Sequence, residues 1–463
     1  MVTTVSREKK SEAQSEASAE VFEISSGNEL QQLYSLMEPY VEFLRMESRI
    51  FVRRQAPERY PWDQDVSLFE ELAKDYGWPE SGHTAEIRSL TKHLPLRDTL
   101  DEVFLDQQER ENLKEEVTRM VSSSLTVLCP DFMSRAHFER VVAELDLSSS
   151  PGFPYVYEYT NNKEFFGVRD GKLDERRVDA VWDMVARRLE ARDSDPIRLF
   201  IKPEPHKLKK LIEGRYRLIS SVSVIDQIID QMIFGEQNNA FLKNYHYTPV
   251  KVGWSWMLGG WREVPRVGML ACDKSSWDWT VSAWLLELEL EVRSNLIVSE
   301  NKDRWLELAR WRYQKLFVDN VFVTSGGLVF RVKRPGLMKS GCVNTIVSNS
   351  LMQLILHVKV SLESGNKIHD IWAMGDDTLQ LDVAWSEDYV RRLRKYCILK
   401  ETNQVSEFAG FRWQGRFIEP LYRAKHAFNI LHVKPKDFDV FALSYNLLYW
   451  RSEFLGEIQK LFP

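Results

Sequence analysis

The sequence is poor in the features that build disulfide-rich, zinc-binding or membrane-spanning proteins. Its 463 residues include only four cysteines, which are scattered and form no C-x-x-C pair or other spacing typical of zinc ligands. No secretory signal is recognisable upstream of them. No run approaches the roughly 18 apolar residues that a membrane-spanning helix needs. We therefore expect a chain in a reducing compartment, without structural zinc and without a membrane span of its own.

The chain also lacks an excess of positive charge. It has 62 Lys and Arg against 68 Asp and Glu, so its formal net charge is −6 at pH 7. Any nucleic acid would have to be bound by a local basic surface, because the field of the whole protein does not attract polyanions. What the sequence does have is apolar material, with 44% hydrophobic and 12% aromatic residues. This composition predicts a globular protein with a large core.

Composition changes along the chain indicate how it is organised. The first 20 residues are rich in Ser, Glu, Lys and Ala, and we predict a flexible tail over 1–27. Apolar residues recur at helical spacing over 30–54, and further helices are expected within 98–124 and 174–192. In the last third, β-rich stretches and apolar helices cluster rather than alternate. This arrangement favours an α+β fold over a doubly wound sheet.

Two adjacent carboxylates stand out in the stretch IWAMGDDTLQLD, where Asp376 and Asp377 follow Gly375. Two ionised neighbours repel each other, and their burial is costly unless a cation is present. The flanking segments 368–374 and 378–383 read as two short strands, which places the pair at the tip of a β-hairpin. Carboxylates on such a tip suit Mg²⁺, which keeps positions open for substrate phosphates. For the tripeptide alone, a solvated turn is the alternative.

Two segments upstream offer companions for this pair. Asp273 ends a strand-like run, and Asp278 follows five residues later at the start of an amphipathic helix, where capping that helix is its alternative role. A loop at residues 340–341 opens a long helix on which Thr345 and Asn349 lie four residues apart. These two side chains share a helix face, so they are expected to point into a site. Ordinary polarity of a helix surface is the alternative.

The order of these segments resembles a known family. CDKSSWD, SGCVNTIVSN and GDD are similar to motifs A, B and C of viral RNA-dependent RNA polymerases, with wording closest to sobemoviruses and their relatives. Residues 198–217, RLFIKPEPHKLKKLIEGRYR, resemble motif F, and residues 148–155, SSSPGFPY, resemble motif G. Lys400 fits the motif D lysine, and residues 407–413 fit the motif E hairpin. The resemblance covers roughly residues 145–415 of the chain.

This resemblance implies a right-hand polymerase, with a palm formed by an antiparallel sheet backed by helices. It would copy an RNA template from NTPs with two Mg²⁺ or Mn²⁺ ions. The implied catalytic residues are Asp273, Asp376, Asp377 and Lys400, of which the three carboxylates would be the metal ligands. The implied NTP contacts are Lys202, Lys210 (or Lys209 in its place), Arg215, Arg217, Asp278, Ser340, Gly341, Thr345 and Asn349. The implied template contacts are Ser150, Gly152 and Pro154.

The resemblance also implies a division of the chain and a set of partners. We expect the fingers mainly in 28–264 with a palm helix near 222–240, palm in 265–300 and 336–415, an insertion in 301–335, and a short thumb in 416–463. Partners would be template and nascent RNA, NTPs, and other viral replication proteins or a protein primer. The expected location is the host cytoplasm, in a membrane-associated complex reached through partners. The mode of initiation stays open.

Two alternative functions are weaker. A reverse transcriptase is disfavoured because Asp278 and Asn349 suit recognition of a ribose 2′-hydroxyl. A non-catalytic RNA-binding module is disfavoured because all three carboxylates are intact. A cluster of tryptophans could pack in the core or stack on bases, and we expect core packing. These are Trp254, Trp256, Trp261, Trp277 and Trp279.

Overall fold

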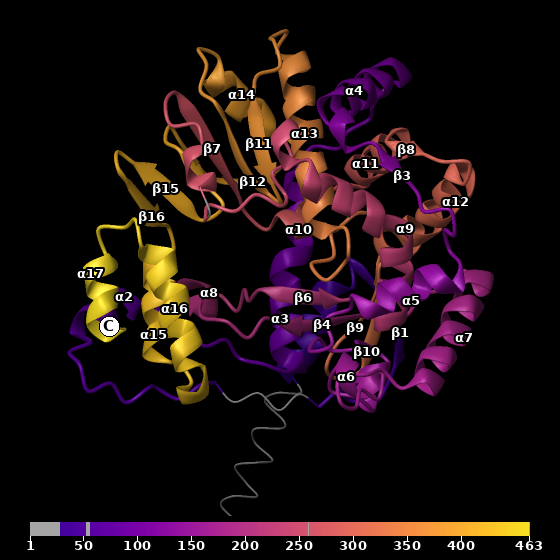
Figure 1. The fold of residues 1–463 in the computed structure, drawn as a ribbon, viewed down its shortest axis with the longest axis horizontal. Coiled ribbons are helices and arrows are strands. Elements are labelled where there is room, and N and C mark those ends of the chain that lie inside the picture. Colours follow the sequence, from indigo (N-terminus) through magenta and orange to yellow (C-terminus); the bar gives the residue numbers. More distant parts are fainter. Residues whose placement is uncertain (1–27, 52–55, 258, 463) are drawn as a thin grey trace, which may run out of the picture.

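The computed structural model describes residues 28–51, 56–257 and 259–462. The tail predicted for residues 1–27 lies outside the described residues. The chain contains both helices and strands (Figure 1), with 48% helix and 15% strand. The strands group into separate, largely antiparallel sheets, so the α+β class is confirmed.

One of the sheets has four strands, in the order β11-β12-β7-β13. All three pairings are antiparallel. Its strands are β7 (Met269–Lys274), β11 (Ile371–Met374), β12 (Asp377–Leu381) and β13 (Leu399–Asn403). The helix α13 (Thr345–Glu363) packs against β11, and most of its residues are buried. A helix that is apolar on nearly every face needs this complete enclosure.

A second sheet joins three distant parts of the sequence in the order β1-β10-β9-β4-β6. Its strands are β1 (Val41–Met46), β10 (Leu328–Val332), β9 (Val321–Val323), β4 (Ile197–Ile201) and β6 (Leu218–Ser221). The helix predicted over 30–54 is therefore partly wrong, because only 28–37 are helical before β1 begins. The conformation of residues 41–46 is set by pairing with β10, more than a hundred residues away in sequence, and not by the local helical periodicity.

The other predicted helices form close to the expected bounds. The segment 98–124 contains α4 (Gln107–Met120), which starts late because the Asp106 side chain caps it by accepting the Glu109 N–H at 2.8 Å. The segment 174–192 contains α7 (Glu175–Ala191), capped by Asp174. The helix expected near 222–240 is α9 (Val224–Lys243).

The remaining elements surround these sheets and helices. Up to β7 they are α2 (Ser67–Ala73), β2 (Tyr76–Gly77), α3 (His83–His93), η1 (Leu94–Thr99), η2 (Ser122–Ser124), β3 (Thr126–Val127), α5 (Arg135–Ala143), η3 (Tyr155–Tyr157), α6 (Asn162–Phe165), β5 (His206–Lys207), α8 (Leu208–Ile212), η4 (Tyr245–Tyr247) and η5 (Gly260–Arg262). After β7 they are α10 (Trp277–Thr280), α11 (Ala283–Asn295), β8 (Ile297–Val298), α12 (Lys302–Tyr313), η6 (Gln314–Asp319), α14 (Ser386–Leu393), β14 (Glu407–Phe408), β15 (Phe411–Gln414), β16 (Phe417–Pro420), α15 (Arg423–Leu431), η7 (Pro435–Asp437), α16 (Phe438–Tyr449) and α17 (Leu455–Leu461).

The C-terminal helices share a core with a segment from the opposite end of the chain. Phe69 and Ala73 of α2 are buried in one cluster with residues of α15, α16 and α17. Trp62 and Trp78 pack against the same cluster. The C-terminal unit is therefore completed by residues that precede it by more than three hundred positions.

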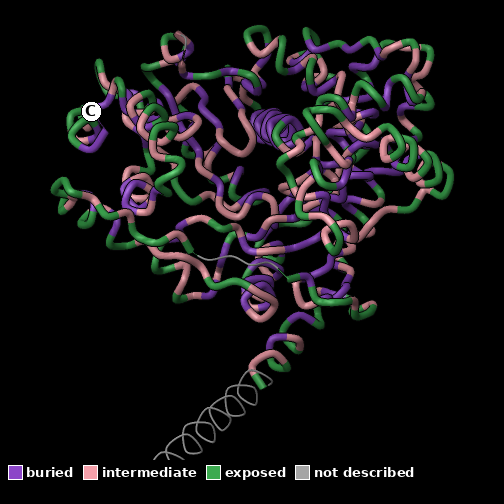
Figure 2. Tube along the Cα trace, turned by 60° about the horizontal axis from the view of Figure 1, so that its bottom comes forward, coloured by how far each residue is buried: buried purple, intermediate pink, exposed green. Residues whose placement is uncertain are grey.

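Buried and exposed residues separate clearly across the molecule. Figure 2 shows buried residues filling the interior, while exposed residues follow the outer turns. Four of the five tryptophans singled out in the sequence are buried (Trp254, Trp256, Trp277 and Trp279), which confirms core packing for them. The Trp261 ring is partly buried and lies 3.5 Å from the Arg451 guanidinium. Across the described residues, every helix is too short or too polar to cross a bilayer.

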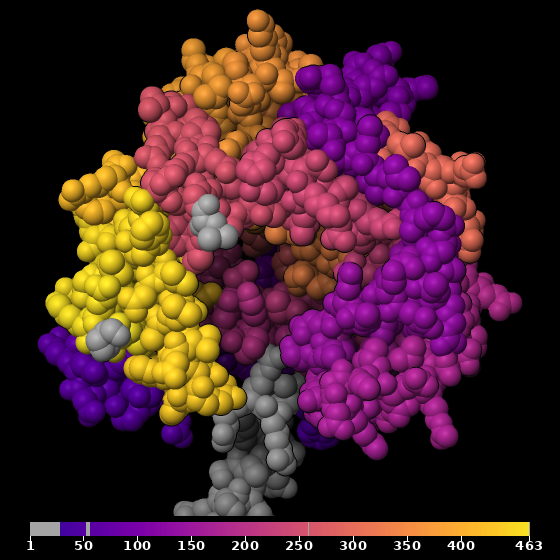
Figure 3. All heavy atoms as spheres, in the orientation of Figure 1, coloured from indigo at the N-terminus to yellow at the C-terminus, as the bar shows by residue number. Residues whose placement is uncertain are grey.

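The face seen in Figure 1 is hollowed at its centre. Figure 3 shows this hollow between the C-terminal helices on one side and helices of the N-terminal half on the other. Atoms of the segment around 200–220 are visible inside it.

Candidate functional site

The hairpin predicted around Gly375 is present. β11 pairs with β12 so that Met374 lies opposite Asp377, and Gly375 turns the chain with φ of +64°. A left-handed φ of this kind favours glycine over residues with a side chain. The Gly375 N–H donates to Ser350 Oγ of α13 at 2.8 Å, which fixes the tip of the hairpin against the helix. Ser350 was not among the predicted site residues.

The strand register brings the third carboxylate to this tip. Thr378 lies opposite Cys272 in the antiparallel pair β12–β7, so Asp377 comes next to Asp273 across the two strands. On the other side of β7, Glu401 of β13 lies opposite Asp273. Residues more than a hundred positions apart are thus joined at one edge by sheet pairing alone.

The carboxylates of this site are hard to ionise together. Burial, followed by the charge of Asp376, raises the pKa of Asp377 to about 6. Burial also raises the pKa of Asp376. Asp278 has a pKa of about 6 for the same two reasons, burial and the charge of Asp376. A bound cation would stabilise the ionised forms of all three groups.

Two lysines partly offset these negative charges. Lys274 is buried, and its Nζ donates to Thr378 Oγ1 at 2.5 Å and to the Cys272 carbonyl at 3.2 Å. Its charge lowers the pKa values of Asp376 and Asp377 against the larger effect of burial. The Nζ of Lys400 on β13 donates to Asp273 Oδ2. Lys400 was predicted here, whereas Lys274 was not, although it directly follows Asp273 in the sequence.

Asp278 occupies a place slightly different from the one expected. It lies in α10, a separate short helix before the long α11, so it does not cap the long helix. Its Oδ1 accepts from Asn349 Nδ2 at 3.2 Å, and the Asn349 Oδ1 accepts from Trp277 Nε1 at 2.9 Å. The predicted pair of Asp278 and Asn349 is therefore in contact. Trp277, for which the sequence favoured core packing over base stacking, also orients the Asn349 amide.

The loop before α13 packs tightly on β6. The Ser340 hydroxyl accepts from the Ser220 N–H at 3.0 Å, and the Gly341 N–H donates to the Ser220 carbonyl at 3.0 Å. A Cβ at position 341 would lie 2.5 Å from the Ser220 oxygen, so only glycine fits here. Thr345 Oγ1 donates to the Lys339 carbonyl at 2.6 Å. The Ser340 and Thr345 hydroxyls thus hold the loop in place, while Asn349 points to Asp278.

The basic segment 198–217 forms most of a long hairpin, in which β4 pairs with β6 and α8 lies in the connection between them. A carboxylate at its turn holds three cations, because Glu204 lies 2.6 Å from Arg217 Nη1, 3.1 Å from Lys202 Nζ and 2.9 Å from Lys425 Nζ. Burial alone would raise the pKa of Glu204, but these cations lower it to about 2. Lys425 belongs to α15, so this contact ties the hairpin to the C-terminal unit. Neither Glu204 nor Lys425 was predicted as a site residue.

The other predicted cations of this hairpin lie nearby. Lys210 is partly buried, and burial together with the charges of Arg215 and Arg217 lowers its pKa. Arg215 Nε is 3.4 Å from Glu213 Oε2. The charge of Arg217 also lowers the pKa values of Asp278 and Asp376, against the opposing effect of burial. The structure therefore brings the basic hairpin close enough to the carboxylates for their charges to interact.

The predicted template residues lie in a separate loop. Gly152 has φ of +72°, and a Cβ there would come within 2.9 Å of the Ser223 Cα at the start of α9. The Ser150 hydroxyl accepts from the Gly152 N–H at 3.4 Å, and Pro154 leads into η3. The contacts of Ser150 and Gly152 are with this loop and with the start of α9, and they do not reach the carboxylates.

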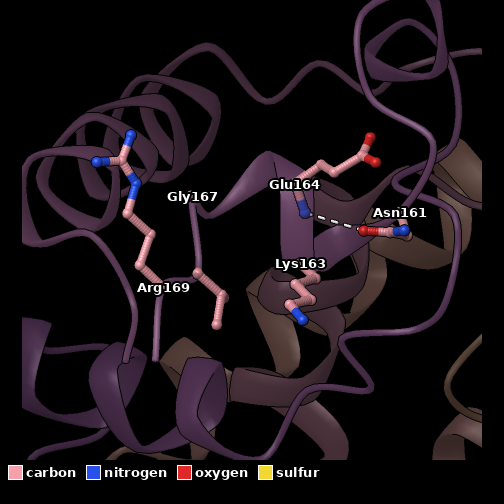
Figure 4. A pocket seen from close by; sticks show the side chains of 6 residues that line it. Asn161, Lys163, Glu164, Gly167 and Arg169 are labelled. Atoms are coloured by element: carbon pink, nitrogen blue, oxygen red, sulfur yellow. Dashed lines mark hydrogen bonds between the residues drawn. The ribbon is translucent and has the colours of Figure 1, made fainter. Parts of the chain in front are cut away.

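A cavity of about 430 Å³ lies further along the same region, at α6 (Figure 4). Asn161 Oδ1 accepts the Glu164 N–H at 2.9 Å and caps the helix. Lys163 and Arg169 also line the cavity, but the predicted template residues do not.

Residues 99–382 match the sequence model of a family described as viral RNA-dependent RNA polymerase. Protein P2-P3 of Poinsettia latent virus is 30% identical over 352 residues, which cover 64% of this chain and 31% of that protein. The replicase polyprotein P2AB of Southern cowpea mosaic virus is 30% identical over 352 residues, covering 68% of this chain and 34% of that protein. Protein P1-P2 of Pea enation mosaic virus-1 is 30% identical over 371 residues, which cover 69% of this chain and 30% of that protein. The chain thus spans about a third of the length of the curated relatives it matches.

Proposed function

Because this chain belongs to the family of viral RNA-dependent RNA polymerases, we propose that it synthesises RNA from NTPs on an RNA template and so replicates a viral genome. The observation that carries this proposal is the meeting of Asp273, Asp376 and Asp377 at one edge of an antiparallel sheet. In two-metal phosphoryl transfer, carboxylates of this kind hold the ions at the reacting phosphate.

Polymerases of this family use divalent metal ions. The residues fit such ions, since burial makes Asp376 and Asp377 difficult to ionise without a cation. We propose two ions, Mg²⁺ or Mn²⁺, held by Asp273 and Asp376 with Asp377 beside them. When bound, they would sharpen the attacking hydroxyl and neutralise charge on the triphosphate.

The remaining residues would bind and orient the substrates. Lys202, Lys210, Arg215 and Arg217 are placed to meet a triphosphate, for which arginine offers bidentate hydrogen bonds. The contact between Asp278 and Asn349 would recognise the ribose 2′-hydroxyl. Lys400, whose Nζ donates to Asp273 Oδ2, would give a proton to the departing pyrophosphate. The loop with Ser150, Gly152 and Pro154 would guide the template.

The division into fingers, palm and thumb is also a proposal. The sheet with β7, β11, β12 and β13 would be the palm, in segments 265–300 and 336–415. The sheet joining β1, β4, β6, β9 and β10 supports assigning both 28–264 and the insertion 301–335 to the fingers side. Residues 416–463 would form the thumb, together with the α2 segment that packs on them.

Partners and location follow the same reasoning. Template RNA, nascent RNA and NTPs are the partners that the polymerase family implies. We propose that other viral replication proteins or a protein primer also bind the chain. We further propose that they recruit it to a membrane-associated complex in the host cytoplasm.

Primer extension on a homopolymeric RNA template tests the function. The purified chain is given NTPs or dNTPs, with and without Mg²⁺, beside Asp376→Asn as a matched inactive control. We expect extension only with NTPs and Mg²⁺, and only by the parent. Extension with dNTPs at a similar rate would favour a reverse transcriptase. RNA binding without any extension would favour a non-catalytic module.

A further inference from the structure

A cavity of about 310 Å³ lies outside the site described above, between η1, the turn before β1 and the segment that follows β10. Apolar side chains form much of its wall, among them Pro39, Leu94, Pro335 and Leu337, and Tyr40 adds an aromatic ring. Its volume is within the range of about 300–1,000 Å³ that small-molecule sites occupy. Sites of this kind combine apolar walls with a few polar groups.

Arg97 supplies an unusual polar group in this wall. Its residue is only 8% exposed. Within the described part of the chain, its Nε and Nη1 are buried without a hydrogen-bond partner. Burial lowers the pKa of Arg97 to about 10, and repulsion by Arg334 contributes. The charges of Glu102 and Asp98 raise this pKa only in part. A buried guanidinium whose N–H groups lack hydrogen bonds is unfavourable, so it should stabilise an anion that enters the cavity.

The carboxylates nearest to Arg97 are held by another arginine. Arg334 Nη1 donates to Asp98 Oδ1 at 2.8 Å, and its Nη2 donates to Glu102 Oε1 at 2.8 Å. Lys333, a further lining residue, donates its Nζ to the Glu38 carbonyl at 2.8 Å. The lining thus holds three cations, Arg97, Lys333 and Arg334, against one carboxylate, Asp98. Among the described residues, no carboxylate forms an ion pair with Arg97 or Lys333, so the cavity keeps a positive character.

We propose that this cavity binds the phosphate group of a small ligand, either free phosphate or a mononucleotide, with Arg97 as the partner of the phosphate. A guanidinium presents parallel N–H groups that match two phosphate oxygens. The apolar wall and the Tyr40 ring leave room for the body of a nucleotide. The inference goes beyond polymerisation, since none of these residues belongs to the nucleotidyl-transfer site.

Two walls of the cavity continue directly into the polymerase site. η1 follows α3, whose last residue His93 stacks on Trp279 with ring centroids 5.2 Å apart, next to Asp278. Leu337 has a left-handed φ of +64°, and the Met338 N–H that follows it donates to the Asp278 carbonyl at 2.8 Å. A ligand that contacts Leu337 would therefore shift the backbone that holds Asp278. It should change the apparent KM for NTPs.

Binding can be measured without catalysis. The full chain is titrated calorimetrically with inorganic phosphate and, separately, with GMP in the presence of EDTA. GMP lacks the leaving pyrophosphate, and EDTA removes the metal ions that the NTP site would need. Arg97→Met keeps an unbranched side chain as far as the position of Nε and removes the charge, and we expect it to weaken binding at least roughly tenfold. Its melting temperature without ligand should hold or rise, because an unpartnered buried charge is gone.

Two controls separate this site from the polymerase site. Arg331→Met removes an exposed arginine that pairs with Glu42, and it should leave binding unchanged. Asp376→Asn should lose primer extension but still bind the ligand. Equal affinity for phosphate and GMP would identify free phosphate as the source, and tighter binding of GMP would identify a mononucleotide. Binding that is equal in the parent and Arg97→Met, or no binding of either probe at about 1 mM, would overturn the proposal.

Discussion

Asp377 shares its hairpin tip with Asp376, and at the scale of single residues it gives a test of the cation site. Its folded-state pKa of about 6 lies above the ordinary value of 3.8. The stability linked to this group is therefore fully present below about pH 4 and is lost as the pH rises through 6. In EDTA, we expect Asp377→Asn to melt at a higher temperature than the parent at pH 8, and at the same temperature near pH 4.

Melting curves of both proteins between pH 4 and pH 8 check this expectation. Adding Mg²⁺ at pH 8 should raise the melting temperature of the parent more than that of Asp377→Asn, because the variant has lost a ligand. A difference between the two proteins that does not change with pH would mean that Asp377 is already solvated.

The contact between Asp278 and Asn349 should decide which sugar is used. A site that hydrogen-bonds a hydroxyl rejects the analogue without it, because its buried polar groups are left unpaired. We expect Asp278→Ala and Asn349→Ala to lower kcat/KM for NTPs far more than for dNTPs. Trp277→Phe should show a smaller loss of the same kind, since it removes the indole N–H that orients Asn349. Equal losses for both sugars would make this contact purely structural.

Lys400 can be tested by single-turnover kinetics. A positioned proton donor speeds such a step by roughly 10²- to 10⁴-fold, so Lys400→Leu should slow nucleotide addition with little change in NTP affinity. Arginine should rescue poorly, because it keeps the charge but hardly gives up a proton. The alternative is a lysine that only neutralises Asp273. In that case Lys400→Arg would restore the parental rate.

At the scale of elements, local signals predicted some parts of the fold well and others not at all. The hairpin around Gly375 and α7 follow from turn residues, caps and apolar spacing that lie within each segment. β1 could not be predicted, because its conformation depends on pairing with β10. The same holds for Glu204 and Lys425, whose contact joins two segments by tertiary structure alone. The carboxylates were found because their chemistry is visible in the residue types themselves.

The C-terminal helices illustrate this limit most clearly. Residues 416–463 were expected to form a short thumb, and the core of their helices also includes Phe69 and Ala73 of α2. A unit this small buries too little apolar surface to be stable alone. The segment around α2 supplies the missing surface, and nothing in its sequence indicates its partner.

A pair of neighbouring residues tests this shared core. Phe69 is buried and Leu68 is 43% exposed, although both belong to α2. Phe69→Ala should lower the free energy of unfolding by about 3–5 kcal/mol, since it leaves a cavity in the core. Leu68→Ala, the matched control, should have an effect within about 0.5 kcal/mol. Denaturant unfolding measures the change in free energy for both variants. In limited proteolysis of Phe69→Ala, we expect the first cuts to fall in the C-terminal helices. Cuts elsewhere would argue against a common core.

At the scale of the whole molecule, a protein with a net negative charge would have to bind RNA, which is also negatively charged. The net charge is −6, so RNA binding should depend on the basic hairpin 198–217. We expect affinity for template RNA to fall steeply with salt, because bound phosphates release counterions. Arg217→Ala should raise the apparent KM for NTPs, whereas Arg45→Ala, a control at an exposed ion pair, should not. Filter binding across a salt series and steady-state kinetics give the two measurements. Salt-insensitive binding would place the RNA on a different surface.

Glu204 gives the triphosphate a competitor that is part of the chain. Its carboxylate is held by Lys202, Arg217 and Lys425, so an arriving phosphate meets cations that are already engaged. A tethered competitor acts at a constant effective concentration, which diluting the protein cannot lower. Substrate binding is therefore an exchange of one anion for another. The net free energy of binding is smaller than the number of cations suggests. Because Lys425 is not among the proposed triphosphate contacts, it would remain the cation paired with Glu204 after the exchange, and the link between the basic hairpin and α15 would then rest on this one ion pair.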